Sequence, residues 1–218
     1  MKAKYLINLH KALTFIFVLA LMVIYKNFTI GAWVYLALHG TYGILWLLKD
    51  QIYPDKKWEQ EIPVPVGIFS LILISLYWVA PFILISSGSV PSSPLIAAAI
   101  SINILGVFLH YSSDAQKYYT LKYKPGLITE GFFARCRNTN YLGEFCTYLS
   151  FALLTQHWLP FAILGLFTAI IFVPNILNKD KSLSRYSEFQ EYKANSGLFL
   201  PKIWGNTSQA DTAEVKSN

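Results

Sequence analysis

A polar cluster between Arg135 and Glu144 lies directly before an apolar run, and its residue types can bind a charged ligand. Charged side chains are costly inside a bilayer, so such a cluster at the mouth of a membrane span indicates a functional site. If a helix begins near Asn140, then Asn140, Glu144 and Tyr148 repeat at i, i+4 and i+8 and share one face. The pattern predicts a cofactor pocket lined by Arg137, Asn140, Tyr141 and Glu144. The simpler alternative is an interfacial belt in which an arginine pairs with the glutamate.

Charged residues also gather where the fourth apolar stretch ends. His110, Asp114 and Lys117 lie at i, i+4 and i+7 and share a helix face. In a nucleotide site, Asp114 would orient a ribose or an amide, while Lys117 and Lys122 would contact phosphates as point charges. The alternative is a basic interfacial helix on anionic lipid, in which Asp114 and Lys117 form a weak pair at i, i+3.

A third constellation consists of His39, Tyr42, Trp46 and Lys49, which follow one stripe of the second apolar stretch. Tyr42 is a candidate general acid, with His39 as its partner. A purely structural histidine is the alternative for His39. An aromatic belt and a snorkelling lysine explain Trp46 and Lys49 without any function.

These clusters must be positioned by membrane helices. Apolar residues form 54% of the chain and charged residues 14%, whereas a soluble domain has about 25% charged residues. The composition therefore predicts an all-α, multispan transmembrane bundle. Roughly 20 apolar residues cross a bilayer as one helix. Six stretches approach that length, at about 9–25, 29–48, 63–86, 94–112, 140–156 and 158–178.

The basic residues predict the orientation of the bundle. Lys26 is the one basic residue of 18 in a connection on the far side, and Lys11 is counted with the near side as a flank of the first stretch. Both termini are therefore expected to be cytoplasmic, in a bacterial inner membrane or the endoplasmic reticulum. The net charge of +6 is then explained by basic residues that orient the chain in the membrane and contact lipid head groups, and we expect no nucleic-acid partner. On the cytoplasmic side Cys136 and Cys146 should stay reduced.

Residues 1–204 read as one integral membrane domain, and residues 205–218 as a disordered polar tail. Between 179 and 193, apolar positions recur at helical spacing, which predicts an amphipathic helix docked at the membrane surface. Arg185 and Tyr186 on that helix would close the pocket from below. No Rossmann or P-loop pattern is present, no metal site is predicted, and the oligomeric state stays open.

Four motifs, taken in order, resemble the steroid 5-alpha-reductase C-terminal domain family, the three-oxo-5-alpha-steroid 4-dehydrogenase-like group. The wider group includes sterol reductases and isoprenylcysteine methyltransferase-like enzymes. The resemblance covers about residues 100–202, and its motifs are Ser113–Lys117, Gly126–Phe133, Arg137–Glu144 and Lys181–Lys193. It implies NADPH bound from the cytoplasmic side and reduction of a carbon–carbon double bond in a lipid or steroid-like substrate.

The resemblance also implies roles for individual residues. Asp114 would meet the ribose or nicotinamide region, and Arg137 would approach a phosphate. Asn140, Tyr141 and Glu144 would line the nicotinamide end. Arg185 and Tyr186, with Lys117 and Lys122, complete the expected cofactor site. Glu144 is also a catalytic candidate, and Tyr42 or His39 is expected to supply the proton.

Two departures from the family pattern matter. Thr139 stands where the family usually has proline, which presets the first helical turn; a threonine can cap that turn instead. The acid–tyrosine pair expected in the N-terminal half has no clear match, which favours a lipid other than a steroid.

Two alternatives remain. The first is an S-adenosylmethionine-dependent membrane methyltransferase of the isoprenylcysteine carboxyl or phospholipid N-methyltransferase type. Such enzymes carry adjacent glutamates after the last span, where this chain has Lys179, Asp180 and Lys181; that difference favours the reductase. The second is a non-catalytic lipid-binding membrane protein, and retention of the polar set from Arg137 to Glu144 argues against it.

Overall fold

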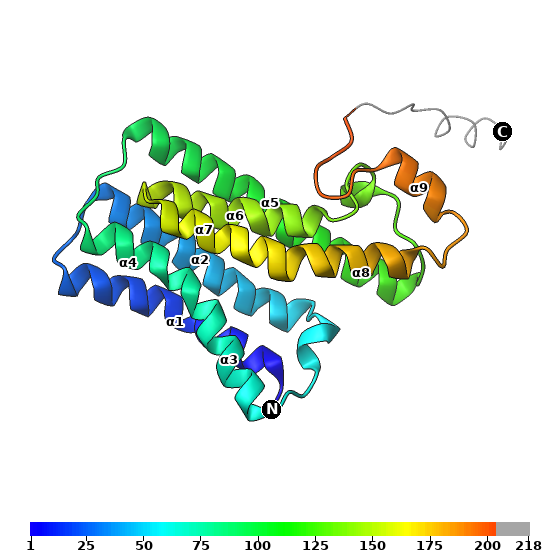
Figure 1. Ribbon diagram of the computed structural model, residues 1–218, viewed down its shortest axis with the longest axis horizontal. Helices are drawn as coiled ribbons and strands as arrows, with labels where there is room; N and C mark the ends of the chain where they lie inside the picture. The colour runs from blue at the N-terminus through cyan, green and yellow to red at the C-terminus, as the bar shows by residue number, and fades with distance from the viewer. Residues whose placement is uncertain (204–218) are drawn as a thin grey trace.

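The computed structural model describes residues 1–203, and the tail predicted at 205–218 lies outside them. The described part is an all-helical bundle without named strands (Figure 1). Its α-helices are α1 (Ala3–Ile24), α2 (Ile30–Ile52), α3 (Val64–Ser75), α4 (Val79–Ser86), α5 (Ser93–Tyr123), α6 (Thr139–Thr155), α7 (Trp158–Phe167), α8 (Val173–Leu183) and α9 (Phe189–Asn195). Short helical turns join or flank them at Lys56–Glu59 (η1), Leu76–Trp78 (η2), Gly131–Phe133 (η3) and Thr168–Phe172 (η4).

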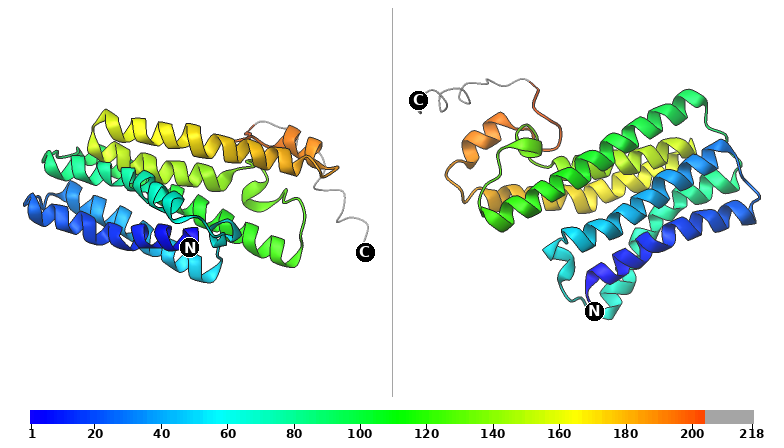
Figure 2. Two further views of the ribbon diagram at one scale, coloured as in Figure 1. Left: turned by 60° about the horizontal axis from the view of Figure 1, so that its bottom comes forward. Right: turned by 180° about the vertical axis from the view of Figure 1, so that it is seen from behind.

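Five helical segments among the described residues are long and apolar enough to cross a membrane. They are α1, α2, the run α3–η2–α4, α5 and the run α7–η4–α8. The sixth predicted span is α6, which has 17 residues and packs against α5 along its length (Figure 2). The multispan helical bundle predicted from composition is confirmed.

Two helices extend beyond the apolar stretches of the sequence. α1 begins at Ala3 instead of residue 9, and Lys11 packs inside the bundle. α5 continues past residue 112 to Tyr123, as the helix face shared by His110, Asp114 and Lys117 predicted. Asp114 and Gln116 in this part of α5 contact partners on α2 and on the loop after α5. The polar end of α5 thereby reaches the walls of the cavities described below.

α5 and α6 approach closely at two glycines. A Cβ on Gly106 would lie 2.7 Å from the backbone nitrogen of Thr147. A Cβ on Gly143 would meet the backbone of His110 and of Gly106. Small residues at membrane helix interfaces allow such backbone approach. The contact fixes α6, and with it the polar face at its N-terminal end, against α5.

The segment α7–η4–α8 contains a π-turn at Thr168–Phe172. Pro174, at the start of α8, has no N–H to donate to the carbonyl of Ile170, and the chain around this position is wound wider than an α-helix. The turn places Ile171 and Phe172 against the interior of the bundle.

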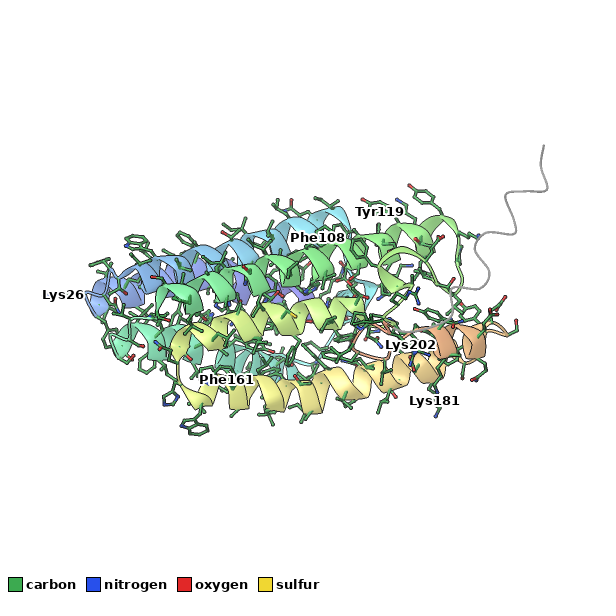
Figure 3. All side chains as sticks on the ribbon, turned by 90° about the horizontal axis from the view of Figure 1, so that it is seen from above. Lys26, Phe108, Tyr119, Phe161, Lys181 and Lys202 are labelled. Atoms are coloured by element: carbon green, nitrogen blue, oxygen red, sulfur yellow. The ribbon has the colours of Figure 1, made fainter. Side chains whose placement is uncertain are left out.

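The polar connections lie at one end of the bundle, which we call the polar end: residues 53–63, 124–138 and 184–203. Lys181 and Lys202 lie at this end, and Lys26 lies at the opposite one (Figure 3). Phe108 and Phe161 project outward from the sides of the bundle, and both are exposed. Lys26 therefore lies at the end of the bundle opposite Lys181 and Lys202, and the orientation of the termini stays a prediction.

The single amphipathic helix predicted at 179–193 is divided. α8 ends at Leu183, residues 184–188 form a turn, and α9 begins at Phe189. The hydroxyl of Ser184 donates to the carbonyl of Lys181 at 2.7 Å, a local bond that competes with helix continuation. Tyr192 of α9 is buried and donates its hydroxyl to the carbonyl of Phe133 at 2.8 Å. The segment packs on the polar-end loops of this chain.

Candidate functional site

The predicted stripe on α6 lines a cavity inside the bundle. Asn140, Glu144 and Tyr148 all border it, as their i, i+4 and i+8 spacing predicted. This inner cavity measures about 150 Å³. About half of its remaining wall is aromatic and aliphatic, with residues from α1, α2, η2, α7 and the π-turn that include Ile7, Trp46, Tyr77, Phe167, Ile171 and Phe172. The other half is polar or charged: His10, Lys11, Lys49, Asp55, Lys57, His110, Asp114 and Asn175.

A second, outer cavity of about 450 Å³ opens at the polar end. Its cationic side chains come from the loop after α2, from α5, from the loop before α6 and from α8: Lys57, Lys117, Arg137 and Lys179. Asn140 and Tyr141 border both this cavity and the inner one. The first turn of α6 therefore borders both cavities, and of the two linings only that of the inner cavity contains tryptophan side chains.

A third cavity of about 460 Å³ lies beside them, and we call it the side cavity. Lys49, Lys117 and Lys122 border it together with Asp114. Asp55 borders all three cavities. The loop that follows α2 is thus a shared wall of the whole site.

Asn140 has an unused hydrogen-bond acceptor at this boundary. Its Oδ1 atom is buried and has no hydrogen-bond partner among the described residues. A buried acceptor without a partner costs about 1–3 kcal/mol. The arrangement suits a ligand that brings an N–H donor, such as a carboxamide.

Asp114 forms ion pairs that the sequence did not predict. Its carboxylate accepts a hydrogen bond from Lys49 Nζ on α2 and lies 3.3 Å from His110 Nε2. The side chain of Asp114 is 11% exposed, so these contacts are largely shielded from water. The predicted weak pair with Lys117 is wrong, because Lys49 reaches the carboxylate from the neighbouring helix.

Tyr53 follows α2 and borders the side cavity. Burial, with the nearby Asp114 carboxylate as the next contribution, raises the pKa of Tyr53 to about 12. The phenol therefore stays protonated and donates to the carbonyl of Tyr111 at 3.1 Å. This bond ties the start of the polar-end loop to α5.

Arg137 does not present a free guanidinium to a phosphate. Its Nε and Nη2 donate to the carboxylate of Asp180 at 3.0–3.2 Å, and its Nη1 donates to Ser196. Arg137 is 4% exposed. Arg137 borders the outer cavity, and its donors are engaged by α8 and the C-terminal segment; its approach to a phosphate stays a prediction.

The arginine–glutamate pair of the simpler interfacial alternative is also absent. Glu144 has no ion-pair partner within residues 1–203, and its side chain borders the inner cavity. Thr139 is not a capping residue, because α6 has Asn138 at its N-cap and begins with Thr139. The hydroxyl of Thr139 instead donates to the carbonyls of Phe132 and Cys136, which fastens the preceding loop.

Tyr42 and His39 do not form the predicted pair. The ring nitrogen Nδ1 of His39 contacts the hydroxyl of Tyr35 at 3.1 Å, one helical turn away. The Tyr42 hydroxyl is buried without a partner, and both residues are 0% exposed. Neither borders the three cavities, because Phe151 stacks over His39 at 4.2 Å between centroids.

The remaining predicted cofactor residues separate into two groups. Lys117 borders both large cavities, and Lys122 borders the side cavity. Arg185 and Tyr186 contact each other at the surface, with the guanidinium 4.9 Å from the ring centroid. They border none of the three cavities, because the turn after α8 leads them away; Tyr192 of α9 borders the outer cavity instead.

Sequence reasoning missed Lys11, Asp55 and Asn175 as site residues. Lys11 was counted as a flank of the first span, yet it is 6% exposed and borders the inner cavity. Its position between apolar residues on both sides is a signal that it lies within a helix. No feature of the sequence marks Asp55 or Asn175 as a cavity residue. Asp55 is placed by the course of the loop after α2, and Asn175 by the π-turn before it.

Cys136 and Cys146 are free, as predicted, and no cluster suited to a metal ion occurs within residues 1–203. The fold is that of a multispan helical membrane protein, and the three neighbouring cavities form a candidate ligand site. The family model described as "Protein of unknown function (DUF1295)" matches residues 49–196, and the chain belongs to that family. No curated protein and no solved structure matches the chain.

Proposed function

We propose that the protein is a membrane-embedded, NADPH-dependent reductase of a carbon–carbon double bond in a lipid. The observation that supports it best is the junction at Asn140 and Tyr141, where the outer cavity with its cationic side chains meets an inner cavity whose wall is partly aromatic and aliphatic. A reductase of this kind needs a compartment for a polyanionic nucleotide next to one for an apolar substrate. The motifs that resemble the steroid 5-alpha-reductase C-terminal domain family all lie within residues 49–196, the part matched by the family model.

The cationic walls suit NADPH. A pyrophosphate and a 2′-phosphate require cations, and Lys57, Lys117 and Lys179 border the outer cavity. Lys117 keeps the phosphate role that the sequence pattern gave it, and Lys57 and Lys179 add to it. S-adenosylmethionine has no phosphate, and its sulfonium and ammonium outweigh its single carboxylate, so its net positive charge would be opposed by the same lysines. This difference favours the reductase over the methyltransferase.

The boundary residues suit the nicotinamide end. The unpartnered Oδ1 of Asn140 would accept a hydrogen bond from the carboxamide, and Tyr141 and Glu144 lie on the same end of α6. Bound NADPH would supply hydride at this position. The chain itself would exclude water through the aromatic wall and direct polar groups at the charge that develops on the substrate.

The inner cavity, at about 150 Å³, would hold only the reacting end of a lipid. Drug-sized ligands occupy pockets of about 300–1,000 Å³. The rest of the substrate would therefore extend toward the membrane. With the basic residues on the cytoplasmic side, the outer cavity would open to soluble nucleotide.

Calorimetry on detergent-purified, full-length protein with NADPH and with S-adenosylmethionine tests this proposal. We expect NADPH to bind, and added salt to weaken it because the contacts are ionic. Binding of S-adenosylmethionine alone would overturn the reductase in favour of the methyltransferase. Binding of neither would favour a non-catalytic lipid-binding protein.

A further inference from the structure

The side cavity has no role in the proposed reductase function, which uses the outer and inner cavities. It measures about 460 Å³ and lies between the end of α2 and the polar end of α5. Two carboxylates border it, those of Asp55 and Asp114. They are outnumbered by the bordering lysines, which are Lys49, Lys56, Lys117 and Lys122. The lining therefore carries a net positive charge.

Most of this positive charge is not used by the protein itself. Lys49 donates to Asp114, so these two charges offset each other. The carboxylate of Asp55 accepts a hydrogen bond from the backbone N–H of Lys57 and caps the turn η1. Three bordering lysines take part in no ion pair within residues 1–203: Lys56, Lys117 and Lys122. Their ammonium groups can bind an anion from outside the chain.

The cavity lies at the depth of the lipid head groups. α5 has 31 residues and is therefore about 46 Å long, whereas the hydrocarbon core of a bilayer is about 30 Å thick. The apolar part of α5 ends near residue 112, which places Lys117 about 7 Å beyond the hydrocarbon. The head-group layer is about 5–8 Å deep on each side. Lys117 can thus reach a lipid phosphate without leaving its helix.

Aromatic and aliphatic side chains lie next to these lysines. Tyr53 and Tyr118 border the cavity, with ring centroids 6.4 Å apart. Tyr119 lies at the surface beside them (Figure 3). Leu121 also borders the cavity, and it is exposed, as is Ile52 at the end of α2. Tyrosine is enriched at the head-group level of membranes, and exposed leucine and isoleucine suit acyl chains. The surroundings of the cavity therefore fit a lipid.

The side cavity and the outer cavity have largely separate sets of cations. Lys56 and Lys122 border the side cavity and are absent from the lining of the outer one. Lys57 and Lys179 border the outer cavity and are absent from the lining of the side one. Lys117 is the lysine that the two linings share. Binding at the two cavities can therefore be altered independently.

We propose that the side cavity binds the phosphate head group of an anionic phospholipid through Lys56, Lys117 and Lys122. Basic pockets between membrane helices bind such head groups. Tyr118 and Leu121 would contact the glycerol and the upper part of an acyl chain. The bound lipid would join the end of α2 to α5 and hold the loop that walls all three cavities. Lys122, expected to contact a nucleotide, would contact a lipid phosphate instead.

Native mass spectrometry of the full-length protein in detergent, titrated with dioleoyl phosphatidylglycerol or dioleoyl phosphatidylcholine, tests this proposal. The two lipids have the same acyl chains, and only the first has a net negative head group. We expect the wild-type protein to bind phosphatidylglycerol about tenfold more tightly, because each lysine near the membrane surface attracts anionic lipid. The double variant Lys56→Gln/Lys122→Gln should lose most of this preference. Both lysines are exposed, so the variant should fold.

Lys124→Gln/Lys181→Gln is the matched control. It removes the same charge from exposed positions at the same end of the bundle, and neither residue borders the three cavities. We expect it to keep the lipid preference of the wild type. An equal loss of preference in both double variants would assign the effect to diffuse surface charge and overturn the inference. Equal affinity of the wild-type protein for the two lipids would also overturn it.

Two further measurements separate the lipid from soluble ligands. An excess of inorganic phosphate should leave phosphatidylglycerol bound; complete displacement would assign the cavity to a free phosphate and overturn the lipid proposal. In calorimetry, Lys56→Gln/Lys122→Gln should bind NADPH as tightly as the wild type does. A parallel loss of NADPH affinity would make the side cavity part of the cofactor site and overturn the proposal. The lipid titration contains no NADPH, so a protein that keeps the lipid preference but binds no NADPH would contradict the reductase proposal alone.

Discussion

Arg137 and Asp180 form a two-pronged ion pair that joins the loop before α6 to the end of α8. Nε and Nη2 of the arginine both reach the carboxylate, a geometry that only a planar guanidinium provides. The same arginine donates to Ser196, which connects the C-terminal segment to both helices. The pair therefore holds together three segments that surround the outer cavity.

Asp180→Asn should destabilise the protein strongly. It leaves a guanidinium that is 5% exposed without its counter-charge, and breaking such a buried pair costs about 3–5 kcal/mol. We expect the unfolding midpoint in detergent, followed by circular dichroism, to fall by about 10 °C. Arg185→Lys at the exposed surface is the control and should leave the midpoint unchanged. Equal midpoints for Asp180→Asn and wild type would show that the pair contributes nothing.

Gly143→Ala should also destabilise the protein, through the backbone contact between α5 and α6. The added methyl group would meet the backbone of His110, and overpacking of this kind costs about 1–3 kcal/mol. Gly165→Ala is the matched control, because nothing lies within 4 Å of its added methyl group. Alanine should stabilise α7 there by up to about 1 kcal/mol. The unfolding temperatures of the two variants should shift in opposite directions. Shifts in the same direction would contradict the close backbone contact between α5 and α6.

Lys117→Gln should weaken NADPH binding about tenfold if the basic cavities hold its phosphates. The lysine borders both large cavities, and a hydrogen bond to a charged group contributes about 1.5–3 kcal/mol. Lys181→Gln is the control, since that residue is exposed and borders none of the three cavities. Calorimetry at two salt concentrations measures both variants. A Lys117→Gln protein with wild-type affinity and salt dependence would remove Lys117 from the site.

Glu144→Gln should separate ligand binding from folding. Glu144 has no ion pair within residues 1–203, so the neutral isostere should lower the free energy of unfolding less than Asp180→Asn does. Its carboxylate borders the inner cavity, where the nicotinamide end is proposed, so NADPH binding should weaken. Glu130→Gln, on an exposed loop, provides the comparison. A large loss of thermal stability with unchanged NADPH affinity would assign Glu144 to packing.

The sequence predicted best those features that depend on short-range spacing. Apolar length and charge segregation located the helices, and the i, i+4, i+8 rule placed Asn140, Glu144 and Tyr148 on one cavity wall. A helix face is a local property, and the fold preserved it. The resemblance in motif order likewise selected Lys117 and Tyr141, which border the outer cavity.

The errors concern partners that are distant in the sequence. Arg137 bonds to Asp180, 43 positions away, and Lys49 bonds to Asp114, 65 positions away. No local pattern says which cation meets which carboxylate once the helices pack. Lys11 was misinterpreted for the same reason. A lysine near the start of a membrane span usually marks the cytoplasmic side, but the Lys11 side chain points into the bundle and donates to Tyr148.

The π-turn at Thr168–Phe172 has a consequence for the angular register of the chain. Each residue of an α-helix advances the side-chain direction by about 100°, so one extra residue in a wide turn rotates everything that follows it. Asn175, Lys179 and Asp180, which contact the cavities or Arg137, all lie after this turn. Deleting one residue from Thr168–Phe172 would keep the hydrophobicity of the span almost intact and rotate these three side chains out of alignment. The geometry of the outer cavity thus depends partly on the membrane-spanning part of the chain, where the π-turn fixes the direction in which the side chains of α8 point.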